Sequence, residues 1–395
     1  MTGPVFPQTK CPRCFHPLPY DVYAWTLKSP ETTGIDDTAT AYTGHTVTMG
    51  EVHTERVPPN DPNWTLLPAS VDASDVDEVC PNCHYVLLPR WRAGHATCIA
   101  MAGARFTGKT VYIAVLIKQL QRLAEQYNEV VQPADQMTRE RFRTHYEQPL
   151  YEEQGVASPT ASATSFAHHP LIFNIGIWNG QTRYLVIRDV AGEDLENPQN
   201  VSGPVLEFFS RADSVFFLFD PLRVKEIAAE LQDMIPIPEL GGDPREVLDT
   251  VLSFVGDGTP SIAVILSKFD AFQKLAEVEN GKWSSAMGNA GAAYNRDPGL
   301  IARQYDHVDG QLVDAEVRSL LQRLGAGPRL RNIRNNVTGQ YYNHRFFVVS
   351  ALGESPSGDK LHRNGISSFR CSDPVRWILA GSGALEEQTW GQVRQ

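Results

Sequence analysis

Long apolar runs are absent from this chain of 395 residues. No stretch approaches the roughly 18 continuous apolar residues that a membrane-spanning helix needs. The first residues lack the basic and apolar pattern of a signal peptide, and the last residues carry no prenylation motif. We therefore expect a cytoplasmic protein without a membrane span.

Basic residues are scarce as well. The chain has 35 Lys and Arg against 46 Asp and Glu, and its formal net charge is −11. Within residues 1–94, six basic residues stand against eleven acidic ones, a balance of −5. Because nucleic-acid binding needs clustered Lys and Arg to neutralise phosphates, we expect no nucleic-acid partner.

Cysteines are few, but four of the six fall into two C-x-x-C pairs, Cys11/Cys14 and Cys80/Cys83. In a cytosolic chain this spacing indicates a metal site, since Zn²⁺ prefers four thiolates in a tetrahedron. The gap between the pairs exceeds the usual length, and a polar insertion explains it at a small entropic cost. We predict a structural zinc ribbon, with a redox-active or vestigial pair as the alternative.

The remaining cysteines and the histidines near the pairs have weaker interpretations. Cys98 lies in an apolar run and is expected to be a buried strand residue, while Cys371 suggests no function. His16 and His84 neighbour the pairs, but four cysteines already satisfy the metal, so neither is expected to be a ligand.

The chain divides into three parts by texture. Residues 1–94 form the zinc-ribbon module with its polar insertion, residues 95–383 alternate apolar runs with amphipathic stretches, and residues 384–395 form a polar tail. Helical spacing of apolar residues predicts a helix over 111–127. The predicted strands are 95–103, 171–178, 184–190, 214–220, 261–268 and 345–352. Apolar strands separated by helices imply an α/β fold with a mostly parallel sheet.

One pair of strands departs from that rule. Only Asn179 and Gly180 separate the run 171–178 from the next strand, which is a two-residue hairpin signal. The two strands should be antiparallel, and we expect the second of them to join the sheet as an edge strand.

A phosphate-binding loop is predicted at residues 103–110, GARFTGKT, which fit the P-loop (Walker A) pattern G-x-x-x-x-G-K-[ST]. Gly103 and Gly108 let backbone N–H groups surround the phosphates, and the following helix adds its dipole. Lys109 is expected to reach the β- and γ-phosphates, and the Thr110 hydroxyl to coordinate Mg²⁺.

Three further segments follow strands of the predicted sheet. Asp189 begins DVAGE, where it can hold Mg²⁺ and Gly192 can offer its N–H to the γ-phosphate. The segment SKFD supplies Asp270, whose carboxylate can accept two hydrogen bonds from guanine but not from adenine. Ligands of such sheets bind at the carboxyl ends of the strands. The predicted nucleotide contacts also include Ser267, Lys268, Ser350 and Ala351.

These four segments resemble the P-loop, switch II, base-recognition and final loops of Ras-like (TRAFAC-class) GTPases. The bacterial double-GTPase 2 type domain, often fused to a zinc ribbon, is the most similar group over about residues 95–380. The resemblance implies a three-layer P-loop fold that binds GTP or GDP with Mg²⁺. Ser267 stands where Asn or Thr is usual.

The resemblance also places two charged residues at the reaction site. Glu193 follows D-x-x-G, where a glutamine commonly positions the attacking water, so it either orients water poorly or is a solvated switch residue. Arg105 lies in the P-loop, where it acts as an arginine finger or points to solvent. As switch I ligand of Mg²⁺, Thr164 is favoured over Thr160.

The leading hypothesis is a GTPase switch, slow without a partner, whose nucleotide state is read by an effector or adaptor protein. A nucleotide-binding scaffold with little or no turnover, or an ATPase, is the alternative. Two long insertions, at about residues 132–154 and 271–344, are natural sites for partner contacts.

Overall fold

The computed structural model describes residues 9–56, 72, 74–155, 169–200, 203–235, 242–279, 281–300, 302–335, 338–356, 360–361 and 365–388. Within these residues, no helix is long and apolar enough to cross a membrane.

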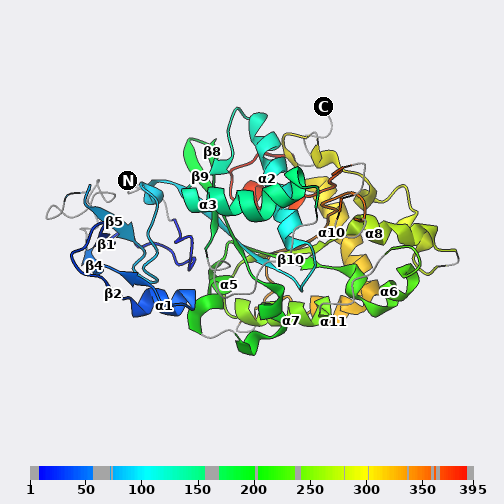
Figure 1. Cartoon of the computed structure of the whole chain (residues 1–395). Helices are drawn as coiled ribbons and strands as arrows, with labels where there is room; N and C mark the ends of the chain where they lie inside the picture. The colour runs from blue at the N-terminus through cyan, green and yellow to red at the C-terminus, as the bar shows by residue number, and fades with distance from the viewer. Residues whose placement is uncertain are drawn as a thin grey trace.

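A seven-stranded sheet forms the centre of the molecule (Figure 1). Its strands are β6 (His95–Ala102), β7 (Gln132–Pro133), β8 (Leu171–Trp178), β9 (Gln181–Asp189), β10 (Ser214–Phe219), β11 (Ser261–Leu266) and β13 (His344–Val348). They lie in the order β13-β11-β10-β6-β9-β8-β7, and the five from β13 to β9 run parallel. The predicted α/β class with a mostly parallel sheet is thereby confirmed.

The expected position of the hairpin strands was wrong in one respect. The hairpin at Asn179 and Gly180 does make β8 and β9 antiparallel, but β9 pairs in parallel with β6 inside the sheet. The antiparallel strand is β8, and the two-residue β7 lies beyond it at the edge. The physical reason is burial: the second half of β9 is buried on both faces, which an edge position would not provide.

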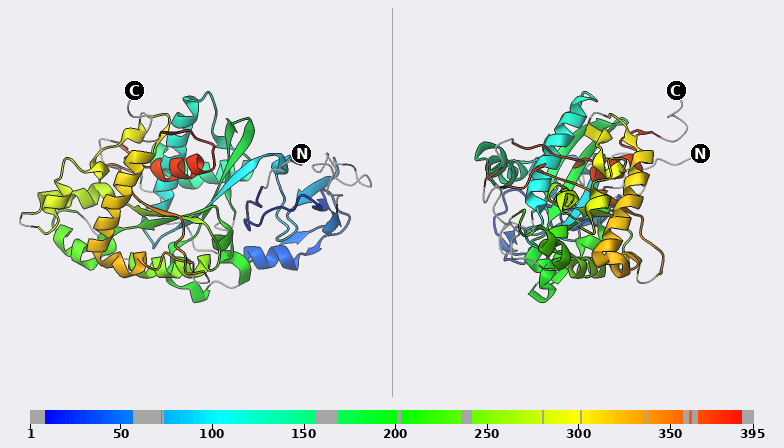
Figure 2. Two further views of the ribbon diagram at one scale, coloured as in Figure 1. Left: turned by 180° about the vertical axis from the view of Figure 1, so that it is seen from behind. Right: turned by 90° about the vertical axis from the view of Figure 1, so that its right-hand side faces the viewer.

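Two layers of helices cover the sheet. Alternate residues of β6 contribute to two separate cores, with Cys98 and Ala100 in one and Ile99 and Met101 in the other. The second core is covered by α2 (Lys109–Glu125), α3 (Gln136–Phe142), a π-helix (Arg143–Glu152) and α12 (Asp373–Gly381). Figure 2 shows α12, in red, on the same face as α2. The first core is covered by α5 (Phe208–Arg211), α7 (Pro244–Val255) and α10 (His307–Leu321).

The N-terminal module lies at one end of the molecule, in blue in Figure 1. It consists of β1 (Val22–Leu27), β2 (Gly34–Ile35), α1 (Asp37–Thr43), β3 (Thr48–Met49), β4 (His53–Arg56) and β5 (Val76–Val79). The strands β4, β1 and β5 form an antiparallel sheet in that order. The four cysteines of the two pairs belong to the same apolar core as one face of the central sheet. The division of the chain at residues 94 and 383 stays a prediction.

Both insertions contain regular structure. The first holds β7, α3 and the π-helix, and the second holds α8 (Phe269–Gln273), α9 (Ser284–Met287), β12 (Tyr305–Asp306), α10 and α11 (Gly327–Leu330). The remaining α-helices and strand of the described residues are α4 (Gly192–Glu196), α6 (Lys225–Leu231) and β14 (Glu387–Gln388), and short 3-10 or π-helical turns connect several elements. Strand β14 pairs with β12 although it lies in the stretch predicted as a tail; residues 389–395 lie outside the described residues.

Candidate functional site

The loop between β6 and α2 has the backbone that a phosphate cradle requires. Gly103 has φ +148° and Gly108 has φ +88°, values that L side chains rarely adopt. A Cβ at Gly103 would lie 2.8 Å from the carbonyl oxygen of Leu218, so β10 passes directly behind the loop. Above Gly108, at the N-terminus of α2, a Cβ would meet no heavy atom within 4 Å. The helix start therefore opens onto free space, where backbone N–H groups can receive an anion.

Lys109 folds back over this loop. Its ammonium donates to the carbonyl oxygens of Gly103 at 2.8 Å and Ala104 at 3.3 Å. Burial lowers the pKa of Lys109, and the nearby carboxylates of Asp189 and Glu196 oppose that shift. The loop thus holds a buried cation next to the carboxyl end of β9, which suits the binding of a phosphate and a metal ion together.

The D-x-x-G segment packs directly on the P-loop. A Cβ at Gly192 would lie 2.4 Å from the backbone nitrogen of Arg105, so only glycine fits at this position. Glu196, at the end of α4, accepts hydrogen bonds from the backbone N–H groups of Arg105 at 2.8 Å and Gly242 at 2.9 Å. Its role was not foreseen from the sequence, because glutamates at the ends of short helices are common.

The two charged residues predicted near the reaction site form an ion pair. The Arg105 guanidinium lies 2.7 Å from the Glu193 carboxylate, and both side chains are about one-third exposed, at 36% and 39%. Arg105 therefore neutralises the charge of Glu193, the carboxylate expected to lie beside the third phosphate.

The base-recognition segment is held by β10. Ser267 donates through its backbone N–H to the carbonyl oxygen of Phe219 at 2.9 Å. The Lys268 ammonium lies 2.7 Å from the carboxylate of Asp220, which is fully buried. Sequence analysis missed Asp220, although its place at the carboxyl end of a strand was a usable signal.

Asp270 is oriented by the loop that follows β13. The Ser350 hydroxyl donates to the Asp270 carboxylate at 2.5 Å and also accepts from the backbone N–H of Gly353 at 2.9 Å. Burial raises the pKa of Asp270, and the hydrogen bond from Ser350 opposes that shift. The structure therefore brings together the two loops predicted to recognise guanine, and Ala351 lies in the second of them.

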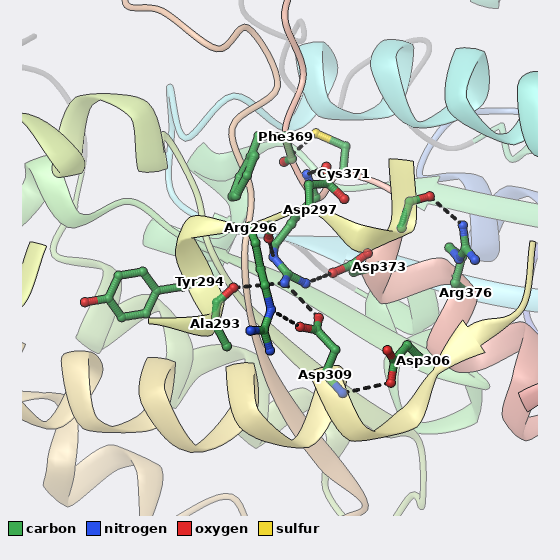
Figure 3. A network of polar contacts seen from close by, with 12 residues as sticks. Ala293, Tyr294, Arg296, Asp297, Asp306, Asp309, Phe369, Cys371, Asp373 and Arg376 are labelled. Carbon is green, nitrogen blue, oxygen red and sulfur yellow. Dashed lines mark hydrogen bonds and ion pairs between the residues drawn. The ribbon is translucent and has the colours of Figure 1, made fainter. Parts of the chain in front are cut away.

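A buried polar network supports the second loop from behind (Figure 3). The Arg370 side chain is 1% exposed and lies 2.7 Å from Asp309 and 2.5 Å from Asp373. It also donates to the carbonyl oxygen of Ala293 at 3.0 Å. Residues of the second insertion and of the C-terminal region thus fix the chain next to Phe369, which pairs with Ser350 through two backbone hydrogen bonds.

Tyr146 is a further residue that sequence analysis missed. It lies in the π-helix of the first insertion and is buried. Burial raises the pKa of Tyr146, the negative charge of Asp189 raises it further, and the positive charge of Arg141 opposes the shift, so Tyr146 lies near the expected Mg²⁺ ligand. Non-local contacts of this kind leave no pattern in the sequence.

The four cysteines of the N-terminal pairs converge. Their sulfur atoms all lie within 4.8 Å of one another, with 3.6 Å between Cys11 and Cys83 and 3.7 Å between Cys14 and Cys80. A zinc tetrahedron with Zn–S bonds of about 2.3 Å has edges of about 3.8 Å, so the four side chains fit this ion.

The backbone around the cysteines completes the fit to zinc. The N–H groups of Arg13 and Asn82 point at the sulfurs of Cys11 and Cys80, each at 3.4 Å. Such hydrogen bonds stabilise thiolates that bind a metal. His84 pairs instead with Asp36 at 2.7 Å, as expected for a residue that is not a ligand.

Other predicted residues are placed as follows. Cys98 is buried in β6, as expected, and Cys371 is buried with its thiol 3.3 Å from the carbonyl oxygen of Ser350. Thr110 is the second residue of α2, directly after Lys109. Thr160 and Thr164, the two candidates for switch I, lie outside the described residues.

The fold and the site together define an α/β protein with a mostly parallel sheet, a glycine-rich loop before α2 and a four-cysteine cluster. Over 389 residues the chain is 48% identical to a protein of Mycolicibacterium smegmatis with the provisional name ESX-1 scaffolding and assembly protein SaeC. The match covers 95% of this chain and 100% of that protein, so the chain belongs to the SaeC family.

The other comparisons add little. No profile of a known protein family matches the chain. A solved structure of an ADP-ribosylation-factor-like GTP-binding protein, the small COPII coat GTPase Sar1 from Encephalitozoon cuniculi in complex with GDP, is 13% identical. The match covers 72% of this chain and 80% of that chain at a TM-score of 0.26, which is too low to carry an argument.

Proposed function

We propose that this chain is a guanine-nucleotide-binding scaffold protein of the Ras-like P-loop class, whose nucleotide state controls how it holds partner proteins. The name of its M. smegmatis relative, which refers to scaffolding and assembly, favours a role in protein assembly over a role centred on catalysis. The two insertions offer surfaces for such partners.

The strand order supports the Ras-like class. Loops that leave the carboxyl ends of β6, β9, β10, β11 and β13 carry the P-loop, D-x-x-G, Asp220, the SKFD segment and Ser350. The antiparallel β8 next to β9 is the arrangement that Ras-like GTPases have between their switch regions. In sheets of this type ligands bind at that edge.

The observation that carries the proposal is the contact of Gly192 with the P-loop. Because a Cβ at Gly192 would lie 2.4 Å from the Arg105 nitrogen, the D-x-x-G segment begins directly beside the phosphate cradle. A segment in this place must respond to a third phosphate, which is the physical basis of a nucleotide switch.

The residues of the site fit a nucleotide and Mg²⁺. Lys109 and the N–H groups at the start of α2 would bind the phosphates, while Thr110 and Asp189 would hold the metal ion, which neutralises phosphate charge when bound. Asp270, oriented by Ser350, would select guanine over adenine.

GTP hydrolysis is the second candidate activity, and the ion pair between Arg105 and Glu193 favours it. A neutralised glutamate is repelled less by the third phosphate and can still bind a water molecule. Because a carboxylate replaces the usual glutamine, we expect turnover no faster than the intrinsic rate of Ras-like GTPases, on the order of 10⁻⁴ to 10⁻³ per second.

Two measurements on the purified full-length chain test these proposals. Competition of unlabelled GTP, GDP and ATP against a fluorescent guanine nucleotide should show displacement by GTP and GDP but not by ATP. Phosphate release from bound GTP should then be slow or undetectable. Equal displacement by ATP, or no binding of any nucleotide, would contradict the proposed function. Rapid phosphate release would show that GTP hydrolysis, rather than scaffolding, is the main activity of the chain.

A further inference from the structure

An arginine joins the N-terminal module to β9, the strand that leads into the D-x-x-G motif. Arg188 precedes Asp189 in β9, is only 3% exposed, and donates to the carbonyl oxygen of Arg13 at 2.6 Å. Arg13 lies between the two cysteines of the first pair, Cys11 and Cys14. The buried Arg188 side chain therefore connects the cysteine cluster to β9, one residue before Asp189, the expected Mg²⁺ ligand.

The backbone that accepts the Arg188 hydrogen bond lies inside the cysteine cluster. Arg13 stands between Cys11 and Cys14, and its carbonyl oxygen lies 2.6 Å from the Arg188 guanidinium. A zinc ion bound by Cys11 and Cys14 would fix the turn that carries this carbonyl oxygen. Loss of zinc would release the turn and so weaken the position of Arg188 at the end of β9.

Aromatic packing extends the same connection. The Arg188 guanidinium lies 3.8 Å from the ring centroid of Phe208, which begins α5. Phe15, directly after Cys14, packs edge-to-face on Phe208 with ring centroids 5.4 Å apart. Phe208 of α5 therefore contacts both Arg188 of β9 and Phe15, the residue after the first cysteine pair.

Two more contacts hold the segment 203–213 to the zinc module. Lys10, next to Cys11, donates to the carbonyl oxygen of Arg211 at 2.8 Å and pairs with Asp213 at 2.6 Å. Helix α1 lies against residues 203–206, where a Cβ at Gly44 would be 3.9 Å from a Val205 methyl. Gly192 therefore lies beside the P-loop, and the later segment 203–213 packs against the N-terminal module.

We infer that zinc occupancy and binding of the nucleotide's third phosphate are coupled, with Arg188 as the positioning residue that holds Asp189 and the segment 203–213 for the triphosphate state. This inference rests on the proposed function. GDP lacks the third phosphate that the D-x-x-G segment would contact, so the coupling changes the affinity for GTP more than the affinity for GDP. By linkage, GTP must strengthen zinc binding by the same factor in affinity by which zinc strengthens GTP binding.

The test compares Arg188→Met with Arg183→Met, a matched control on the same strand. Arg183 is also buried, but its guanidinium lies 3.5 Å from the carbonyl oxygen of Ser382, which is far along the chain from the cysteine pairs. In titrations with fluorescent GTP and GDP analogues, we expect Arg188→Met to lose roughly fivefold or more in GTP affinity with GDP affinity unchanged. Arg188→Lys, which keeps the charge, should restore part of the loss.

Zinc transfer to a coloured chelator provides the second readout. GTP should slow the transfer in the wild-type chain and in Arg183→Met but not in Arg188→Met. Hydrogen exchange of the unliganded chain gives the third: zinc removal should speed exchange in residues 203–213 and leave α12 unchanged.

The outcomes separate this inference from the proposed function. A GTP-to-GDP affinity ratio that is the same with and without zinc, or unchanged exchange in residues 203–213, overturns the coupling alone. A wild-type chain that binds zinc but no guanine nucleotide overturns both.

Discussion

The guanidinium of Arg105 and the carboxylate of Glu193 form an ion pair at 2.7 Å, across the place where the P-loop meets the D-x-x-G segment. Each residue alone is unusual for its position in the motifs that this sequence shares by resemblance with Ras-like GTPases. In the ion pair the two charges neutralise each other, so a substitution of either residue changes how strongly the other attracts or repels a phosphate.

Glu193→Gln should strengthen GTP binding roughly three- to tenfold over GDP, because a negative charge beside the third phosphate is removed and Arg105 is released. The partly exposed pair contributes at most about 1 kcal/mol, so the melting temperature should hardly change. Titration with fluorescent nucleotides measures the ratio. Weaker GTP binding in Glu193→Gln would show that the glutamate contributes to the site in its charged form.

Glu196→Gln should also favour GTP, because the amide oxygen can still accept from the N–H groups of Arg105 and Gly242 while the charge near Lys109 is lost. Glu196→Ala is the contrasting variant: it leaves two N–H groups without their acceptor and should cost about 1–3 kcal/mol of stability. Chemical unfolding and nucleotide titration distinguish the two effects. Equal nucleotide affinities in wild type and Glu196→Gln would place this carboxylate outside the site.

Lys109→Ala should weaken binding of both GTP and GDP by roughly 100-fold or more, since the ammonium is the buried cation of the phosphate cradle. Lys225→Ala, at an exposed lysine of α6, is the matched control and should bind as the wild type does. Isothermal titration measures both. Unchanged GTP affinity in Lys109→Ala would remove the phosphate-site assignment.

Asp270→Asn should shift preference from guanine toward xanthine nucleotides, because the amide offers a donor to the xanthine oxygen. Ser350→Ala removes the hydroxyl that donates to Asp270 at 2.5 Å and should weaken guanine binding without that shift. Asp233→Asn, on the surface after α6, is the control. Competition between GTP and XTP decides, and an Asp270→Asn variant that still prefers GTP would mean that another group recognises the base.

The network around Arg370 predicts a pH dependence of stability. Burial raises the pKa of Asp373 from 3.8 to about 6, against the attraction of Arg370. Between these values the folded chain binds more protons than the unfolded chain, so this group's contribution to the unfolding free energy falls as pH rises.

Asp373→Asn removes that titration. The unfolding free energy of the wild type relative to Asp373→Asn should therefore fall by roughly 2 kcal/mol between about pH 4 and pH 6. Urea unfolding at a series of pH values measures it, with the exposed Asp233→Asn as control. A difference that is constant over this range would show that Asp373 keeps an ordinary pKa when folded.

Much of the fold followed from local patterns. The predicted strands 171–178 and 261–268 correspond to β8 and β11, and the helix predicted over 111–127 corresponds to α2 at Lys109–Glu125. The turn at Asn179 and Gly180 was predicted because a two-residue hairpin needs residues that accept positive φ. The place of β9 inside the sheet was not predicted, because pairing with β6 depends on contacts far along the chain.

Local patterns of residues were enough to predict the glycines and Lys109 of the loop before α2, the order of the loops along the chain, and the two cysteine pairs. The contacts between these parts became known only from the folded chain: Arg188 donates to Arg13, Glu196 accepts from the backbone of Arg105, and Asp220 pairs with Lys268. Such contacts depend on buried charge and hydrogen bonding between residues that are distant in the chain. Their energies are set by burial, which no local pattern of residues specifies.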